Sequence, residues 1–380
     1  MTAAPIDPAG LAAALRPFGE STMLPGGAYT SDEVLAWERR HLFAGSWTCL
    51  GRTAELRAGS THRAVTVGDI GVMLTFAGDE GGGVVRAFAN TCRHRAHELL
   101  APGCGSDRRA LVCPYHGWSY ELDGSLRTAP RMGADLNARG FGLVELPAAD
   151  WHGWTFVNAT ATARSFAEHL GTLDDHVAPY RPEGLVVKAN HSYTVAANWK
   201  IIAENYHECY HCPQIHPELC AVTPPNSGDN WHEPGAWVGG SMDLRDHAET
   251  MSLDGTSRGV MLDGVDRRAV RYLGIFPNVL LSLHPDYVLT HRLEPLAPAR
   301  TRVECEWLFL DAVVDPSYAV EFWDVTNRQD WRACESVQRG VTSPHYRPGP
   351  LAPNETAIYD WVTMLARAYR DPVAELGPSL

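Results

Sequence analysis

The chain has 380 residues, of which 45% are hydrophobic and 20% charged, a composition typical of soluble globular proteins with room for two domains. The net charge of −13 argues against nucleic acid or an anionic membrane surface as a partner, and no apolar run approaches the ~20 residues of a membrane helix. No secretory signal is visible, and the nine cysteines, an odd number, fit a reducing compartment, so the sequence predicts a cytoplasmic protein.

The first part of the chain predicts an N-terminal arm followed by a small β domain. Residues 1–40 begin with an irregular stretch rich in Ala, Pro and Gly and end in a short amphipathic helix with Ser31 as its N-cap. Alternating strand patterns follow at 63–68 and 71–76, and short strands and turns continue beyond them. We expect the arm and helix to pack on the C-terminal domain, and residues 41–160 to form an all-β domain.

The remainder, residues 161–380, predicts a larger domain in which strands alternate with long helices. The fold class expected for the chain is therefore α+β, with a small β domain set before an antiparallel sheet with helices. The expected helices lie at 163–180, 198–212, 316–340 and 355–371, and the expected strands at 186–195, 279–293 and 301–310.

Two loops of the β domain each supply one cysteine and one histidine. The first offers Cys92 and His94, and the second offers Cys113 and His116 after 18 intervening residues. Structural zinc is the alternative, but zinc fingers more often pair Cys with Cys and His with His along the chain. Mixed pairs suit two irons bridged by sulfide, one bound by both thiolates and the other by both imidazoles. The pattern predicts a Rieske-type [2Fe–2S] cluster.

A second metal site is predicted in the stretch 198–219. Helical spacing places Glu208 and His211 on one face, and Pro213 ends the helix, so that His216 folds back toward His211. Two imidazoles beside carboxylates at the end of a helix indicate a metal site. Hydrogen-bonded core histidines are the alternative for such a pair.

The same stretch contains a C-x-x-C pattern at Cys209 and Cys212, which occurs in redox pairs and in half zinc sites. We expect these two thiols to be core residues rather than ligands. Cys104, which lies between the two loops of the β domain, has no evident disulfide partner and is expected to be a free thiol.

A non-haem Fe(II) site with two imidazoles takes a carboxylate as its third protein ligand. In the helical pattern of 320–337, Asp330 shares a stripe with Trp323 and Asn327, which puts a carboxylate on the inward face. An unpaired charge there is costly. Glu335 falls off that stripe and is the weaker alternative. We therefore predict that Asp330 completes the site.

Together these motifs resemble the oxygenase (alpha) subunit of the Rieske non-haem iron oxygenases, over nearly the whole chain. The resemblance implies a helix-grip catalytic domain, a [2Fe–2S] cluster, Fe(II), and Asp330 at the position of the third iron ligand. It also implies a homotrimer and a separate flavin- or ferredoxin-type reductase that passes on electrons from NAD(P)H. The motifs that carry it are Cys92, His94, Cys113 and His116, then Asn198, Trp199, Lys200, Glu204, Asn205, Glu208, His211 and His216.

Finer features are similar to the quaternary-ammonium branch of that family, which includes glycine betaine monooxygenases, proline betaine demethylases and carnitine monooxygenases. Two positions depart from common patterns. Ala96 stands where relatives commonly have Gly in the cluster loop, and Glu208 stands where ring-hydroxylating members have Asp. The segments that resemble the branch are 204–212, 276–278, 284–287 and 338–340.

The function implied by the resemblance is N-demethylation of a betaine-type compound with release of formaldehyde. Hydroxylation or dihydroxylation of an aromatic or other small substrate is the alternative within the class. An electron-transfer Rieske protein is the alternative outside it, although a second iron site argues against a simple carrier. A quaternary ammonium is best held over aromatic faces, and the leading candidates for this contact are Trp231, Trp237 and Phe276.

Three polar residues beside the predicted iron site have expected roles. Glu204 and Asn205 precede the histidines on the same predicted helix and are expected to orient imidazole N–H groups, with plain helix packing as the alternative. The resemblance implies the role of the third. Glu208 is expected to accept the outer N–H of His211 and to bridge to the partner subunit's His116 across a trimer interface, although a carboxylate that merely orients His211 is the alternative.

Overall fold

The computed structural model describes residues 3–77, 84–133 and 138–371. Within these ranges, no helix has both the length and the apolar character that crossing a membrane requires.

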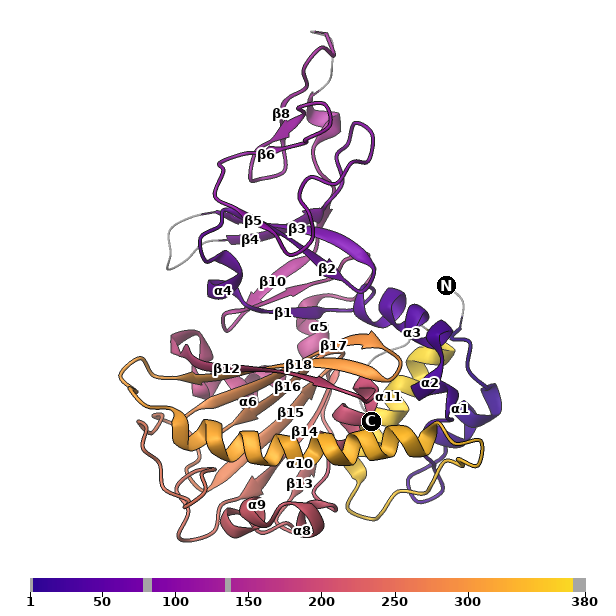
Figure 1. Cartoon of the computed structure of the whole chain (residues 1–380), viewed down its shortest axis with the longest axis vertical. Coiled ribbons are helices and arrows are strands. Elements are labelled where there is room, and N and C mark those ends of the chain that lie inside the picture. The colour runs from indigo at the N-terminus through magenta and orange to yellow at the C-terminus, as the bar shows by residue number, and fades with distance from the viewer. Residues whose placement is uncertain (1–2, 78–83, 134–137, 372–380) are drawn as a thin grey trace. The chain divides into compact units, whose positions relative to one another are not determined.

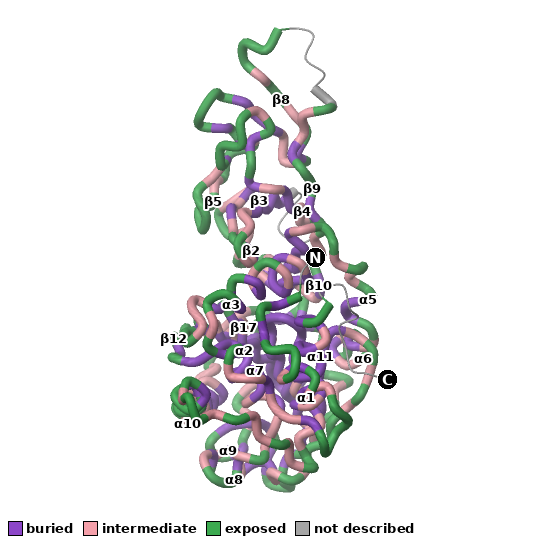
Figure 2. Tube along the Cα trace, turned by 90° about the vertical axis from the view of Figure 1, so that its right-hand side faces the viewer, coloured by how far each residue is buried: buried purple, intermediate pink, exposed green. Residues whose placement is uncertain are grey.

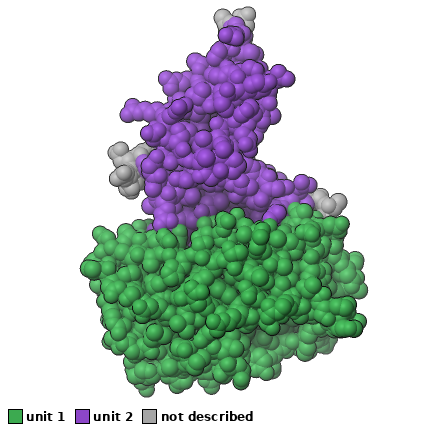
Figure 3. Space-filling model, in the orientation of Figure 1, with its two compact units in different colours: residues 1–37, 167–380 green, residues 38–166 purple. Residues whose placement is uncertain are grey.

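The chain forms two compact units (Figure 3). The large unit comprises residues 1–37 and 167–380, and the small unit comprises residues 38–166. The N-terminal arm thus belongs to the same unit as the C-terminal part of the chain. The three functional domains inferred from the sequence remain a prediction.

The small unit is built from short antiparallel strands in three sheets, with two short helices and a π-helical turn, as expected for an all-β domain. The sheet orders are β5-β2-β3-β4-β9, β1-β11-β10 and β6-β7-β8. The elements are η1 (Arg39–Phe43), β1 (Thr48–Arg52), α4 (Thr53–Arg57), β2 (His62–Val67), β3 (Ile70–Ala77), β4 (Val84–Ala89), β5 (Gly105–Ser106), β6 (Leu111–Val112), β7 (Ser119–Tyr120), β8 (Leu126–Thr128), η2 (Ala138–Phe141), β9 (Glu145–Leu146), β10 (Ala148–Trp151) and β11 (Trp154–Val157).

Strand β3 separates two cores of the small unit, because successive side chains of a strand point to opposite faces. Met73 packs in the core that contains Cys92 and Cys113, whereas its neighbours Val72 and Leu74 pack in the other core. Figure 2 shows buried residues gathered along β3 and β4. The loops with the predicted cluster ligands are therefore seated on one buried face of the central sheet.

The large unit is a seven-stranded antiparallel sheet with helices packed on it, which confirms the predicted α+β class. The sheet order is β12-β18-β17-β16-β15-β14-β13, and the long helix α10 runs across it (Figure 1). The strands are β12 (Val186–Val195), β13 (Asp229–Trp231), β14 (Trp237–Asp243), β15 (Ala269–Ile275), β16 (Val279–Leu283), β17 (Val288–Ala297) and β18 (Arg300–Phe309). The helices are α1 (Pro8–Ala14), α2 (Gly27–Thr30), α3 (Asp32–Glu38), α5 (Phe166–Leu170), α6 (Leu173–Val177), η3 (Ala178–Tyr180), η4 (Pro182–Gly184), α7 (Trp199–Tyr206), α8 (Cys212–Ile215), α9 (Pro217–Val222), α10 (Ser317–Val341) and α11 (Thr356–Arg370).

Predicted elements of the large unit match at β12, β18, α10 and α11 but differ at three places, one of which, the helix over 198–212, is described with the site below. The strand expected over 279–293 is two strands, β16 and β17, joined by the turn 284–287. The helix expected over 163–180 is interrupted at Gly171, which has φ +54°. A Cβ atom at Gly171 would lie 2.0 Å from the carbonyl oxygen of Pro234, so this position requires glycine.

Asn198 caps α7 and ties its start to α10. Its side-chain oxygen accepts a hydrogen bond from the backbone N–H of Lys200 at 3.1 Å. Its own backbone N–H donates to Oε1 of Gln338 on α10 at 2.8 Å, and its Nδ2 donates to the carbonyl oxygen of Pro298 at 2.7 Å. The segment that leads to the predicted iron site therefore starts at a point fixed to α10.

Replacing Ala96 with glycine should stabilise the small unit. Ala96 has φ +57°, a left-handed conformation that costs an L-residue about 1–2 kcal/mol. Because glycine also gains freedom in the unfolded chain, we expect Ala96→Gly to raise the free energy of unfolding by up to about 1 kcal/mol. Thermal unfolding measures this change. Ala101→Gly, at an exposed position outside the left-handed region, should give no gain; equal effects of the two substitutions would contradict the strain argument.

Candidate functional site

The four predicted cluster ligands lie on two tight turns of the small unit, which we call the cluster loops (92–97 and 113–118). In the first loop the backbone N–H of Cys92 donates to the carbonyl oxygen of His97 at 2.9 Å. In the second the backbone N–H of Cys113 donates to the carbonyl oxygen of Trp118 at 2.7 Å. Each turn therefore presents its cysteine and its histidine from one short rigid segment.

The cluster loops bring two thiols and two imidazoles together. Burial, together with contact with the Cys92 thiol, raises the pKa of Cys113. The rings of His94 and His116 have centroids 4.6 Å apart. Nδ1 of His94 is buried and has no hydrogen-bond partner among the described residues, as expected of a nitrogen reserved for a metal. Two sulfur and two nitrogen donors in this arrangement fit a Rieske cluster.

Tyr120, which the sequence did not indicate as a site residue, touches this site. Its hydroxyl lies 3.3 Å from Sγ of Cys92 and accepts a hydrogen bond from the backbone N–H of Arg93 at 3.0 Å. Hydrogen bonds to cluster sulfurs influence the reduction potential. Tyr120 is on the strand that follows the second cluster loop, and nothing in the local sequence pairs it with the first.

The structure corrects the helix predicted over 198–212. Helix α7 ends at Tyr206 with His207 as its C-cap, so Glu208 and His211 lie in a loop. Pro213 is in the first turn of α8, where its missing N–H removes no helical hydrogen bond. The proline therefore belongs to the start of a second helix.

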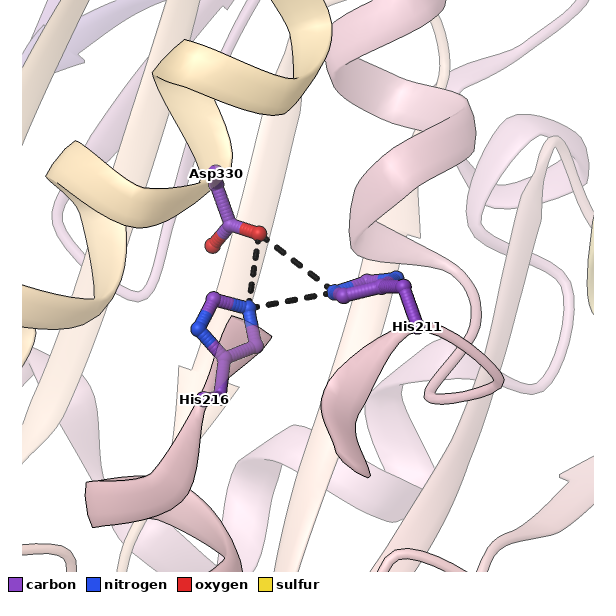
Figure 4. A group of neighbouring side chains, drawn as sticks. All are labelled: His211, His216 and Asp330. Carbon is purple, nitrogen blue, oxygen red and sulfur yellow. Dashed lines mark hydrogen bonds and ion pairs between the residues drawn. The ribbon is translucent and has the colours of Figure 1, made fainter. Parts of the chain in front are cut away.

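His211, His216 and Asp330, which we call the iron triad, converge in the large unit (Figure 4). Nε2 of His211 lies 3.1 Å from Nε2 of His216, and Oδ1 of Asp330 lies 3.4 Å and 2.9 Å from these two nitrogens. The residues come from the loop after α7, the junction of α8 and α9, and α10. Two imidazoles and one carboxylate meeting in this way match the donor set of non-haem Fe(II) sites.

Both imidazoles of the iron triad have a second contact on the opposite ring nitrogen. Nδ1 of His211 contacts Oε1 of Glu208, while Oε2 of Glu208 accepts the backbone N–H of His211 at 3.0 Å. Nδ1 of His216 lies 2.7 Å from Oε1 of Gln329, and Nε2 of Gln329 donates to Oε2 of Glu218 at 2.9 Å. If each Nδ1 carries the proton, each Nε2 keeps its lone pair for a metal. The sequence did not indicate a role for Gln329, although this residue is adjacent to Asp330.

The electrostatics of the iron triad favour a positive charge. Burial opposes a charge on His211, but the Asp330 and Glu208 carboxylates outweigh it and raise its pKa to about 9. Burial likewise opposes a charge on Asp330, yet its contacts with His211 and His216 hold the pKa of this carboxyl below its usual range. A divalent cation between these side chains would compensate the negative charge of the carboxylates more fully than a proton does.

Glu204 and Asn205 do not reach the imidazoles. Oε1 of Glu204 accepts a hydrogen bond from the Tyr29 hydroxyl at 2.9 Å, and burial raises the pKa of Glu204 to about 8. The expectation that Glu204 orients an imidazole is therefore wrong, because this carboxyl joins α7 to α2. Asn205 instead lines the cavity described below.

Cys209 and Cys212 form a disulfide whose closed loop contains His211. The sequence predicted two core thiols there. The turn between α7 and α8 instead brings their Cα atoms to 4.9 Å, within the range that a disulfide spans. Cys104 of the small unit is an exposed free thiol.

A cavity with a volume of 220 Å³ includes the iron triad in its wall. The aromatic side chains of Tyr206, Tyr272 and Trp323 line it, and we call them the aromatic wall. The hydroxyl of Tyr206 lies 2.9 Å from that of Ser282, whereas the hydroxyl of Tyr272 is buried without a hydrogen-bond partner among the described residues. Within the described part of the chain, the lining of the cavity includes no Arg or Lys. It does include four asparagines: Asn205, Asn226, Asn230 and Asn354.

The three aromatic residues named from the sequence as substrate contacts do not line this cavity. Trp231 stacks on His176 with ring centroids 4.3 Å apart. The indole N–H of Trp237 donates to the carbonyl oxygen of Pro234 at 3.0 Å, and Phe276 packs against an aromatic ring of α11. Those interactions with α6, the loop before β14 and α11 could not be read from strand periodicity.

Family comparisons agree with this two-site arrangement. Residues 182–371 match the model of the ring hydroxylating alpha subunit (catalytic domain), and residues 46–147 match that of the Rieske [2Fe–2S] domain. The chain belongs to the Rieske non-haem iron oxygenases. As an oxygenase subunit of this family it contains a [2Fe–2S] cluster and a mononuclear iron, acts on a small organic substrate with O2, and receives electrons from a reductase.

Several Rieske oxygenases are similar to the chain over most of its length. The glycine betaine monooxygenase oxygenase subunit of Chromohalobacter salexigens is 32% identical over 388 residues, which cover 90% of this chain and 86% of that protein. The carnitine monooxygenase oxygenase subunit of Escherichia coli K12 is 28% identical, with 86% of each chain covered. A solved quaternary ammonium Rieske monooxygenase, described with inter-subunit electron transfer, matches with a TM-score of 0.76 at 22% identity and covers 97% of this chain and 100% of its own. The last comparison shows the fold.

Replacing a cluster histidine with cysteine should lower the reduction potential of the Rieske cluster. His ligation raises this potential relative to all-cysteine clusters, so we expect His116→Cys to lower it by on the order of 100 mV or more and to change the visible spectrum. Redox titration followed by absorbance measures both. His97→Cys, at a neighbouring exposed histidine whose ring contacts the backbone of Glu98, should change neither. An unchanged potential in His116→Cys would refute its assignment as a ligand.

Proposed function

We propose that this Rieske oxygenase N-demethylates a betaine-type quaternary ammonium compound. The observation that carries the proposal is the aromatic wall beside the iron triad. A quaternary ammonium cannot donate a hydrogen bond or be neutralised, and each aromatic face in contact with it contributes about 0.5–2 kcal/mol. The glycine betaine and carnitine monooxygenases among the relatives support the same substrate class.

The reaction balances as a two-electron monooxygenation. One atom of O2 enters a C–H bond of an N-methyl group, and the other leaves as water with two electrons from the reductase and two protons. The resulting N-hydroxymethyl ammonium loses formaldehyde and a proton to give the tertiary amine. The iron supplies reductive activation of O2 close to that methyl group.

The residues of the chain provide binding, orientation and charge. We propose that His211, His216 and Asp330 of the iron triad would hold the iron. The aromatic wall holds the trimethylammonium group. Because no cationic side chain among the described lining residues can pair with a substrate carboxylate, the amides of Asn226 and Asn354 are the groups we assign to that end.

The cluster loops supply the residues for the second metal centre. We propose that Cys92 and Cys113 bind one iron of the [2Fe–2S] cluster and that His94 and His116 bind the other. The Tyr120 hydroxyl, next to Sγ of Cys92, would then stabilise the reduced cluster by hydrogen bonding.

The test of the proposed function is a substrate panel. The protein is supplied with a reductase, NAD(P)H and O2, and formaldehyde and O2 uptake are measured with betaines, choline and aromatic compounds. We expect equal amounts of formaldehyde and consumed O2 with a trimethylammonium substrate. Hydroxylation of aromatic compounds without formaldehyde from any betaine would overturn the proposal.

Metal analysis tests the iron triad. The two proposed sites require about three iron atoms and about two acid-labile sulfides per chain. Asp330→Ala should lower the iron to about two while the sulfide stays constant, because a two-histidine site without its carboxylate retains Fe(II) poorly. Glu335→Ala, on the same helix, should retain the wild-type iron content. Full iron occupancy in Asp330→Ala would contradict the assignment.

We also propose that the chain forms a homotrimer in which Glu208 bridges His211 and the partner subunit's His116. Both ends of this bridge are near the surface. His116 is exposed in the small unit, and the Glu208 side chain, 12% exposed itself, lies in a loop whose residue Tyr210 is 65% exposed. Both oxygens of Glu208 already contact His211, but a carboxylate oxygen can accept a further hydrogen bond. A related oxygenase described with inter-subunit electron transfer supports this arrangement.

Replacing Glu208 with glutamine should separate electron transfer from metal binding. If Glu208 bridges the subunits, Glu208→Gln keeps both metal centres and a reducible cluster, yet delivery of electrons to the iron falls by at least about tenfold. Single-turnover reoxidation of the reduced cluster with O2 and substrate measures this rate, and Glu335→Gln serves as the control. Normal reoxidation in an iron-loaded Glu208→Gln variant would end the bridging proposal, and a loss of iron would mean that Glu208 serves to orient His211.

A further inference from the structure

The turn between β16 and β17 lies behind the aromatic wall and has no role in the chemistry described so far. It consists of residues 284–287, and His284, Asp286 and Tyr287 are each fully buried. The backbone N–H of His284 donates to the carbonyl oxygen of Tyr287 at 2.9 Å, which closes the turn. The rings of His284 and Tyr287 stack with centroids 4.0 Å apart and an interplanar angle of 19°.

Tyr287 connects this turn to the cavity through Trp323. The indole N–H of Trp323 donates to the hydroxyl of Tyr287 at 2.8 Å, and that hydroxyl donates onward to the carbonyl oxygen of Met251 at 3.0 Å. Trp323 is one of the three residues of the aromatic wall. The orientation of one cavity-lining ring is therefore set from behind by a single phenol.

Asp286 holds the turn in place. Its carboxylate accepts hydrogen bonds from the hydroxyls of Thr250, Ser257 and Tyr318, each at 2.5 Å. Tyr318 lies on the first turn of α10, and Trp323 lies on the next turns of the same helix. The turn is thus hydrogen-bonded to α10 at two points, through Asp286 to Tyr318 and through Tyr287 to Trp323.

Burial alone does not explain the hydrogen bond of Trp323. This fold tolerates an unsatisfied indole elsewhere. Four other tryptophans have buried indole nitrogens without a hydrogen-bond partner among the described residues: Trp154, Trp307, Trp331 and Trp361. Trp323, in contrast, lines the cavity and donates to a side chain that is itself fixed. The rings of His284 and Tyr272 lie 5.5 Å and 6.5 Å from Trp323, which limits its rotation further.

We propose that Tyr287 is a positioning residue that determines affinity for the quaternary ammonium group by fixing the indole plane of Trp323. The inference rests on the proposed function for its substrate class. A cation gains attraction only over the face of a ring, within about 6 Å of its centroid, so a tilt of the indole weakens binding without changing the composition of the cavity. Tyr287 does not itself appear among the lining residues and acts through Trp323.

The experiment compares Tyr287→Phe with Tyr318→Phe. Both substitutions remove one buried hydroxyl from the same network, but only the first removes the acceptor of the indole N–H. Binding of glycine betaine and of tetramethylammonium to the iron-loaded protein is measured by calorimetry, alongside KM and kcat for formaldehyde release. We expect Tyr287→Phe to raise Kd and KM about fivefold with kcat within about twofold, and Tyr318→Phe to lower Tm and leave Kd unchanged.

Trp323→Phe provides an independent arm that leaves the turn intact. In the Trp323→Phe background, Tyr287→Phe should cause no further rise in Kd, because the group that it positions is gone. Equal Kd values for wild type and Tyr287→Phe, or additive effects in the double variant, would overturn the inference. Wild-type binding without formaldehyde release would overturn the proposed reaction while the Kd comparison still decides the role of Tyr287. Absence of wild-type binding to either ammonium compound would overturn both.

Discussion

Asp330 is a carboxylate on the inward face of α10, with its side chain 15% exposed, and the fold can keep it there only if its charge is compensated. His211 and His216 provide that compensation. They lie far before α10 in the sequence, in the segment that follows α7. The contacts of Glu208 and Gln329 then hold both imidazoles with their outer nitrogens occupied. The buried charge of Asp330 is thus compensated by two imidazoles whose positions Glu208 and Gln329 fix in turn.

Several contacts along α10 fix where Asp330 lies. Near its N-terminus, Tyr318 and Trp323 bond to the turn 284–287, and near its C-terminus Gln338 accepts the backbone N–H of Asn198. Asp330 lies between these anchors. The helix is therefore held against rotation on both sides of the carboxylate. These contacts fix the position of Asp330 relative to His211 and His216.

The sequence predicted those features whose information is local. Cysteine and histidine on one tight turn, two histidines around a proline, and a carboxylate on the apolar stripe of a helix are short-range patterns. The failures involve partners far apart in the chain, since no periodicity pairs Glu204 with Tyr29 or His216 with Gln329. Similarly, strand alternation gives two faces but does not say which face a helix covers, and so the three aromatic residues assigned to the cavity were the wrong ones. The overall α+β fold, in contrast, follows from strand and helix periods alone.

Helix α10 supplies both Asp330 to the iron triad and Trp323 to the aromatic wall, seven residues apart and thus two turns along one face. Any substitution that shifts or rotates this helix therefore displaces Asp330 and Trp323 together. A change of cavity shape made through α10 would act on the iron triad as well. Met242 on β14 and Asn226 line the same cavity from elements other than α10.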